Sequence, residues 1–376
     1  MIFCENCPRL LPGLSIFILF RIVRHFTTSF FVTAICLACA AVWGYANAGL
    51  GGAAAAIYVA AVLGIMEVSL SFDNAVVNAS VLRTWNVFWQ RLFLSLGVLI
   101  AVFGMRLLFP LVIVATAGHL NIAEVWVMAL HQPDQYSAQL ASHHAQIAAF
   151  GGAFLLLVFL NFAIDDEKDV HWLGHIERPL SALGSIGAVP ILLALAAVMA
   201  ASAMVEPDQG ASVMAAGVWG VIVYVAVDVL GGMLENDDAE EGESSAGSAV
   251  ALVKQGGIGA FLYIEVLDAS FSFDGVIGAF AITNDIVLIM LGLAIGAMFV
   301  RSLTVYLVRQ GTLEEFVYLE HGAHYAIGVL AVIMLVSARY HIPDLFTGLI
   351  GIAFVGAALW ASIVHKRQEA AAAQPS

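Results

Sequence analysis

The sequence has few charged residues for its length. Asp, Glu, Lys and Arg together make up 11% of its 376 residues, whereas about a quarter is usual in water-soluble globular proteins. Hydrophobic residues make up 61% of the chain. These proportions exclude a soluble enzyme and predict a protein embedded in a lipid bilayer.

Basic residues are especially scarce. The chain has 14 Lys and Arg against 28 Asp and Glu, a formal net charge of -14. Because binding of nucleic-acid phosphates needs a cationic surface, nucleic acid is excluded as a partner. The acidic excess favours cations as partners instead.

The sequence also lacks any loop long enough to form a separate soluble domain. Its apolar runs, read between polar breaks, predict an all-α polytopic membrane protein with about ten transmembrane helices of roughly 20 residues. The expected spans are residues 30–49, 53–82, 92–115, 147–164, 183–205, 213–234, 257–283, 287–308, 323–338 and 345–364.

The distribution of Lys and Arg predicts the orientation, because cytoplasmic loops retain basic residues. Basic residues precede the first span and recur in every second loop, whereas loops 116–146, 206–212 and 284–286 contain none. Both termini are therefore expected in the cytoplasm. The first apolar run, ending at Ala46-Asn47-Ala48, also resembles a signal peptide with a cleavage site. We favour an uncleaved first helix because the leader before it is long.

Cysteine is absent after residue 39, and the four cysteines form two C-x-x-C pairs, Cys4/Cys7 and Cys36/Cys39. This spacing is typical of zinc binding or dithiol redox chemistry. The second pair lies in an apolar run without a nearby His or charged residue, where Cys usually behaves as a small hydrophobic residue. A transmembrane thiol-redox carrier therefore stays an alternative.

The middle of the chain contains an internal repeat of three helices. Its two units begin at the second and seventh expected spans, so they enter the membrane in opposite directions. An inverted-topology repeat of two three-helix units is the architecture of many secondary transporters, whose substrate sites lie near the midplane. The matching segments are 67–74 with 268–275, 97–106 with 292–301, and 144–151 with 321–328.

The repeat divides the chain into seven parts. They are an N-terminal cytoplasmic extension (1–29), a first transmembrane helix (30–52), the first repeat unit (53–164), a connecting cytoplasmic motif with two helices (165–234), an acidic disordered cytoplasmic linker (235–256), the second unit (257–338), and the last helix with a cytoplasmic tail (339–376).

Several acidic residues fall inside the apolar spans, where an ionised Asp costs about 2.5 to 3.5 kcal/mol at the centre of a helix. Two arginines in the spans could neutralise only two of these acids, so we predict a cation site. Asp228 is assigned a purely structural role instead. The oxygen ligands of the predicted site suit Mn²⁺, Mg²⁺ or Ca²⁺. The expected metal ligands are Glu67, Asp73, Asn74, Glu265, Asp268 and Asp274, with Asn78, Ser272, Arg106, Arg301, His321 and His324 in supporting roles.

Helical geometry places the acids of the first unit on different faces. At about 100° per residue, Asp73 lies about 120° from Glu67 around a straight helix. We therefore expect the helices to unwind near both Ser-Phe-Asp tetrads, where Asn74 or Gly275 tolerates unusual backbone angles.

At these motifs the sequence resembles an integral-membrane branch of the TerC family, within the LysE transporter superfamily. The resemblance covers about residues 27–365. It implies a bacterial inner-membrane protein with two inverted three-helix units, associated with export of manganese or other divalent cations and with tellurium resistance, and it implies Asp73 and Asp274 as metal ligands. The motifs that carry it are 67–74, 150–155, 165–172, 265–275 and 318–324.

The sequence thus predicts a membrane transporter, not an enzyme, that exports a divalent cation, with manganese favoured and proton antiport as the hypothesis for its coupling. The cation is the substrate, and no organic cofactor is expected. Besides the redox carrier, the alternatives are a tellurium-resistance-associated membrane protein without transport, an amino-acid exporter, and an intramembrane zinc hydrolase built on Glu320, His321 and His324. The oligomeric state is left open.

Overall fold

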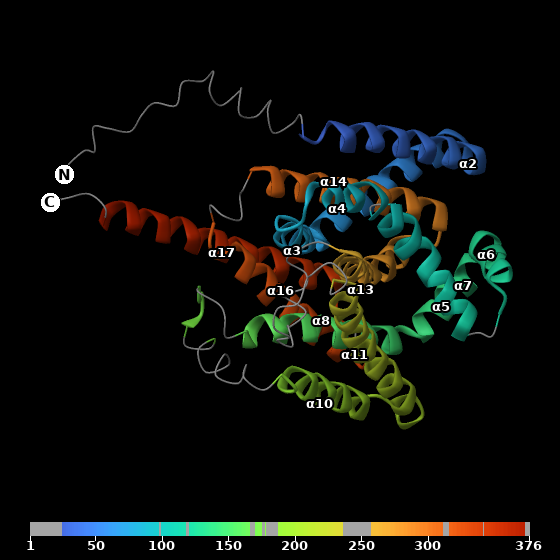
Figure 1. Ribbon diagram of the computed structural model, residues 1–376. Coiled ribbons are helices and arrows are strands. Elements are labelled where there is room, and N and C mark those ends of the chain that lie inside the picture. Colours follow the sequence, from blue (N-terminus) through green and yellow to red (C-terminus); the bar gives the residue numbers. More distant parts are fainter. Residues whose placement is uncertain are drawn as a thin grey trace, which may run out of the picture.

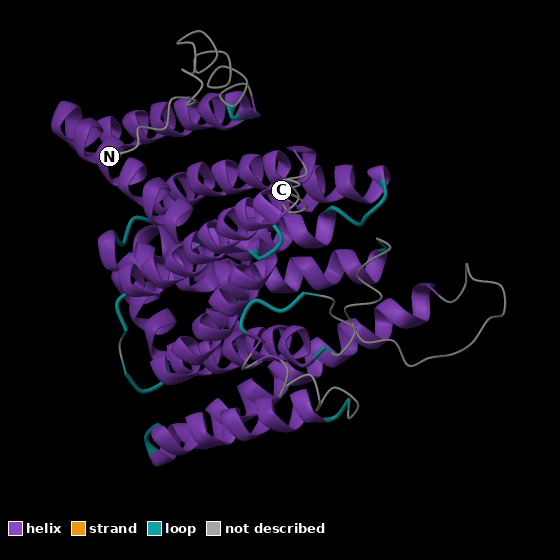
Figure 2. Ribbon diagram, turned by 90° about the vertical axis from the view of Figure 1, so that its left-hand side faces the viewer, coloured by secondary structure: helices purple, strands orange, loops and turns teal. Residues whose placement is uncertain are grey.

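The computed structural model describes residues 25–97, 99–117, 120–165, 170–174, 177, 187–235, 257–310, 316–340 and 342–372. Within these ranges every regular element is a helix, and no strand occurs (Figure 2). The predictions for residues 1–24, including Cys4 and Cys7, and for the linker 236–256 lie outside the described residues.

Six of the described helices are long and apolar enough to cross a membrane. Their lengths and composition confirm a polytopic membrane protein, while the full set of ten crossings stays a prediction. The six helices are α2 (Thr27–Leu70), α8 (His144–Ile164), α11 (Pro207–Glu235), α14 (Ile286–Gln310), α16 (Leu319–Ser337) and α17 (Asp344–Ala372). Helices also lie at the other expected spans, among them α10 (Val189–Met204) and α13 (Ile258–Ile282).

The long helix α2 is a hairpin of two helical arms. The backbone φ and ψ angles of Ala48 and Gly49 are not helical. Gly49 has φ 65°, in the left-handed region that glycine adopts readily. The arms then pack against each other at Gly44 and Gly52, where a Cβ on either residue would collide with the other's carbonyl oxygen. The two arms occupy the first two expected spans.

The second arm of α2 ends within the first tetrad. Ser71, with φ -103° and ψ 16°, separates α2 from α3 (Phe72–Leu82), so an interruption is present near this tetrad as expected. It lies at Ser71 and not at Asn74, which is part of α3. The same expectation is wrong for the second tetrad, because α13 runs without a break through Ser272 and Gly275. The repeated motif therefore adopts two backbone conformations.

The third expected span is wound partly as a π-helix. It begins in α4 (Val87–Leu92), continues through the π-helical segments η1 (Phe93–Gly97) and η2 (Ile100–Leu108), and ends in α5 (Phe109–Ala117). π-helices are rare and frequently lie at functional sites. Helix α14, whose sequence at residues 292–301 matches residues 97–106, is a regular α-helix.

The loop expected at residues 116–146 contains two short helices, α6 (Ile122–His131) and α7 (Pro133–Ser142). A capping box starts α6: Asn121 accepts a hydrogen bond from the helix backbone, and Glu124 accepts one from the backbone N–H of Asn121.

The centre of the bundle is α8, which packs against α11 and α16 (Figure 1). Its residues Phe154, Leu155 and Leu157 are fully buried, as expected for a helix that is apolar on all sides. By contrast, α2 lies at an edge of the bundle against α14 and exposes Phe31, Leu50 and other large apolar side chains. That surface suits contact with lipid tails.

Candidate functional site

A buried ion pair joins α2 to the π-helical segment η2. Glu67, in the last turn of α2, accepts a hydrogen bond on Oε1 from the Arg106 guanidinium and a second one, of 2.8 Å, from the Ser71 hydroxyl. Glu67 is 1% exposed and Arg106 is 7% exposed. Arg106 thus balances one buried carboxylate charge, in the structural role that the sequence allowed.

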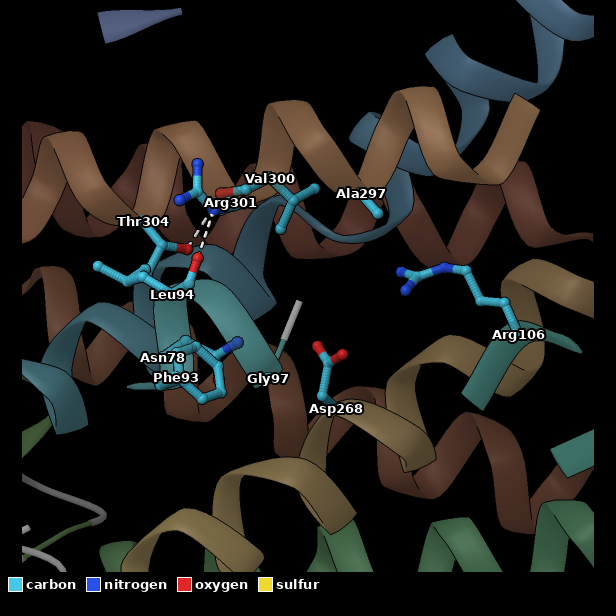
Figure 3. Close-up of a pocket in the computed structure, with 10 residues that line it drawn as sticks. All are labelled: Asn78, Phe93, Leu94, Gly97, Arg106, Asp268, Ala297, Val300, Arg301 and Thr304. Carbon is cyan, nitrogen blue, oxygen red and sulfur yellow. Dashed lines mark hydrogen bonds between the residues drawn. The ribbon is translucent and has the colours of Figure 1, made fainter. Parts of the chain in front are cut away.

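Asp268, on α13, extends this cluster to α3. Its Oδ1 accepts a hydrogen bond of 2.5 Å from Asn74 Nδ2, although the two residues are 194 positions apart. Asp268 also faces a small cavity of about 40 Å³, lined by Asn78, Arg106 and Thr304 among others (Figure 3). Since a water needs roughly 10–15 Å³, this volume can hold about three water-sized particles.

Several buried oxygen atoms of the cluster accept no hydrogen bond within the described part of the chain. Glu265 lies one turn before Asp268, and neither of its carboxylate oxygens has a donor. Buried acceptors without donors are costly, and a cation or a proton would satisfy them. The other oxygens of this kind are Glu67 Oε2, Asn74 Oδ1, Asn78 Oδ1 and Ser272 Oγ.

Two glycines allow the carboxylates of Glu67 and Glu265 to approach the backbone of neighbouring helices. A Cβ on Gly275 would lie 2.7 Å from Glu67 Oε2, and a Cβ on Gly97 would lie 2.5 Å from Glu265 Oε1. Gly275 therefore provides space for the Glu67 carboxylate, and α13 stays helical around it. This corrects the expectation that Gly275 adopts unusual backbone angles.

Asp73 lies apart from the ion pair. Its Oδ1 accepts a hydrogen bond of 3.0 Å from the Asn74 backbone N–H, and its side chain faces α17, where a Cβ on Gly351 would be 3.2 Å from Oδ2. Glu67 and Asp73 thus contact different helices, and the interruption at Ser71 does not bring Asp73 to the ion pair. The side chain of Asp274 lies outside the described part of the structure.

The described side chains contain no group of three His, Cys, Asp or Glu residues placed to hold a metal ion. The carboxylate of Glu67 pairs with Arg106, and that of Asp268 accepts a hydrogen bond from the amide of Asn74. A cation bound here would therefore depend on a mixture of carboxylate, amide and hydroxyl oxygens, with further ligands from water.

Three residues predicted to support the metal site, Arg301, His321 and His324, contact groups outside the acidic cluster. Arg301, on α14, donates through Nε to the carbonyl of Leu94, 2.7 Å away. His321 contacts the Val170 carbonyl at 2.9 Å, and His324 stacks on Phe162 with ring centroids 3.7 Å apart.

The residues proposed for a zinc hydrolase do not gather around one point. Glu320 forms an ion pair of 2.8 Å with Arg83, and the contacts of His321 and His324 tie α16 to neighbouring segments. The described residues therefore give the hydrolase alternative no support.

Thr304 and Gly296 were missed by reasoning from the sequence. Thr304 lies one turn after Arg301 and faces the small cavity, and a Cβ on Gly296 would collide with the Glu67 side chain. Thr304 could have been found as a polar residue within an otherwise apolar span. Nothing in the sequence indicates that Gly296 would lie against Glu67.

Comparison with known proteins identifies the family of this chain. No match is found among curated proteins or among solved structures. A family model described as "Protein of unknown function (DUF475)" matches residues 72–369, which include α3 and most of the elements after it. Because the match covers most of the sequence, the chain belongs to the DUF475 family.

Proposed function

We propose that the protein exports a divalent metal cation, with Mn²⁺ as the favoured substrate, through the polar cluster around Asp268. The excess of buried acid supports this proposal. Within the described residues, the cluster and its surroundings contain Glu67, Asp73, Glu265 and Asp268, each at most 7% exposed, against one buried guanidinium, that of Arg106. Carboxylates inside a membrane are costly unless a cation or proton accompanies them.

The chemistry of the cluster favours a hard cation. Glu265 and Asp268 lie one turn apart on α13, and Asn78 reaches the same cavity as Asp268. Oxygen ligands of this kind suit Mg²⁺ and Mn²⁺, and Mg²⁺ commonly retains several waters beside one or two carboxylates. Monovalent Cu⁺ would prefer thiolate or thioether ligands.

The proposal includes the inverted repeat and its membrane setting. The two units are related by a two-fold axis in the membrane plane, with Asp73 and Asp274 in equivalent positions near the midplane. The resemblance to the TerC family supports a bacterial inner membrane, and the positions of Lys and Arg support cytoplasmic termini. A structure with these carboxylates facing lipid would contradict this arrangement.

Proton exchange is the proposed source of work. Moving a cation outward against an inward-negative potential costs about 2.3 kcal/mol per charge per 100 mV. At least one of Asp73, Asp268 and Asp274 takes up a proton from outside when the metal leaves and releases it to the cytoplasm. The crowding of acids around Asp268 supports this exchange, because like charges repel once the metal is gone.

Reconstituted vesicles test the proposal directly. The full-length protein in liposomes should move Mn²⁺ with proton counterflow. A metal-sensitive dye measures the metal flux and a pH dye measures the proton flux, with Mg²⁺, Ca²⁺ and Zn²⁺ tested as alternative substrates. Asp268→Asn keeps the size of the side chain and should lower the flux at least tenfold, as should Asp73→Asn and Asp274→Asn. The control Asp228→Asn should transport normally.

Two outcomes would contradict the proposal: the absence of flux for every ion tested with a correctly folded protein, and normal flux in Asp268→Asn. Mn²⁺ flux without proton movement would contradict only the coupling mechanism. Whole-cell metal content with and without the protein then identifies the ion and the direction.

A further inference from the structure

A second cavity, distinct from the cation cluster, is strongly basic. It has a volume of about 740 Å³ and lies between the start of α2, the segment α4–η1 and the last turns of α14. Within the described part of the chain, no acidic residue lines it and none of its three arginines forms an ion pair. Its lining residues are His25, Thr28, Arg91, Leu94, Ser95, Arg301, Ser302, Val305 and Arg309.

An apolar cavity of about 360 Å³ lies between the same two helices, α2 and α14. Apart from the hydroxyls of Thr33 and Ser69, its walls are apolar. They are formed by Leu37, Ala61, Gly64, Ile65, Val68, Ile295 and Phe299.

Three contacts show how the two cavities are arranged along the helices. His25 packs on Tyr306 with ring centroids 5.6 Å apart, the Ser29 and Ser302 hydroxyls are 2.7 Å apart, and Phe30 packs on Phe299 at 5.4 Å. Residue numbers rise along α2 as they fall along α14, so the helices are antiparallel here. The basic cavity lies at the end of this pair, and the apolar cavity lies at the next level along it.

We propose that these two cavities bind one anionic phospholipid, with its phosphate in the basic cavity and an acyl chain in the apolar cavity. Guanidinium groups bind phosphate oxygens through paired, charge-assisted hydrogen bonds, and the hydroxyl of Thr28 supplies a further donor. Basic pockets between transmembrane helices on the cytoplasmic side are a known setting for anionic lipid headgroups. The positions of Arg91 and Arg309 predict that this end faces the cytoplasm.

The apolar cavity distinguishes a lipid from a free anion. Inorganic phosphate shares the headgroup's chemistry, but it makes no use of an apolar cavity placed at the next level along the same helices. The edge position of α2 gives a lipid access from the bilayer (Figure 1). The lipid site does not depend on cation transport, although Arg301 also lines the cavity beside Asp268.

Native mass spectrometry of the detergent-solubilised full-length protein tests this site. Dioleoyl phosphatidylglycerol should stay bound, whereas dioleoyl phosphatidylcholine, with the same chains, should bind at least tenfold more weakly. Arg91→Gln and Arg309→Gln should each weaken phosphatidylglycerol binding about fivefold, and the double variant about twentyfold or more. Both arginines are exposed, so the variants should fold.

Matched controls make each outcome decisive. Arg367→Gln, also an exposed arginine with an expected cytoplasmic position, should bind the lipid like the wild type. Ala61→Phe narrows the apolar cavity and should weaken long-chain phosphatidylglycerol without affecting a dihexanoyl form. Equal binding of the two headgroups, an unaffected double variant, an equal loss in Arg367→Gln, an unaffected Ala61→Phe, or complete displacement by millimolar inorganic phosphate would overturn the proposal. Thermal unfolding of each variant verifies that it is folded.

Discussion

The two tetrads of the chain have nearly the same sequence but different structures. In the first, the chain leaves the helix at Ser71, and Asn74 extends its amide to Asp268 of the other segment. In the second, α13 continues without a break, and Gly275 leaves room for the carboxylate of Glu67. Each tetrad thus lies against an acid of the other segment. The amide of Asn74 bonds to Asp268, and Gly275, which has no side chain, leaves space for Glu67.

The difference extends to the arginine of the following helix. Arg106 is buried on a π-helical segment and pairs with Glu67, whereas Arg301 is only half-buried on a regular helix and donates to a backbone carbonyl. Matching sequence therefore does not impose matching conformation. Contacts between the two segments determine where the helix is interrupted and where it stays regular.

Substitution of Arg106, compared with substitution of Arg301, should give the largest difference in stability. Arg106→Gln leaves the Glu67 carboxylate buried without its cationic partner, which should destabilise the protein by about 3–5 kcal/mol. Arg301→Gln loses a single hydrogen bond to a carbonyl and should cost about 1–2 kcal/mol. Thermal unfolding in detergent measures both, and equal losses would mean that the two arginines are equivalent after all.

The glycine of the second tetrad should give the next largest effect. Gly275→Ala places a Cβ against Glu67 Oε2 and should destabilise the fold by about 1–3 kcal/mol through overpacking. The control is Gly356→Ala on α17, an exposed position where a Cβ meets no atom within 4 Å. That variant should be neutral or slightly more stable. If Gly275→Ala matched it in the same unfolding assay, the close approach of Glu67 would be disproved.

The serines at equivalent positions of the two tetrads should give the smallest effect. Ser71 donates a hydrogen bond of 2.8 Å to Glu67, so Ser71→Ala should cost about 0.5–1.5 kcal/mol. The Ser272 hydroxyl is buried and has no hydrogen-bond partner among the described residues, so Ser272→Ala removes an unpaired polar group and should leave stability unchanged or raise it. A larger loss at Ser272 than at Ser71 would reverse the comparison.

Helix positions could be predicted from the sequence because apolar runs of membrane length are a strong signal. An interruption near the first tetrad was also predicted, because a straight helix would place Glu67 and Asp73 on different faces. The break lies at Ser71, whereas Asn74 stays within α3, and it does not bring Asp73 to the ion pair of Glu67. Periodicity around a single helix could therefore predict that the helix is interrupted, but not where each acid points.

The remaining features depend on packing between distant segments. The partner of Glu67 could have been either arginine, and the approach of Glu67 to Gly275 joins residues far apart in the chain. The π-helical winding of η1 and η2 has no local sequence signature, since its apolar residues suit an α-helix equally well. Helix α6 is different, because its capping box at Asn121 and Glu124 was a local signal that the sequence did contain.

The hairpin form of α2 affects the order in which the chain can assemble during synthesis. Both arms are apolar and reverse at Gly49, so they can enter the bilayer together as one unit as soon as they leave the ribosome. Glu67 lies near the end of the second arm, and its partner Arg106 is made 39 residues later. Until η2 arrives, this carboxylate must stay at the wet membrane surface or carry a proton. Completion of the first hairpin is therefore coupled to insertion of the helix that follows α3 and α4.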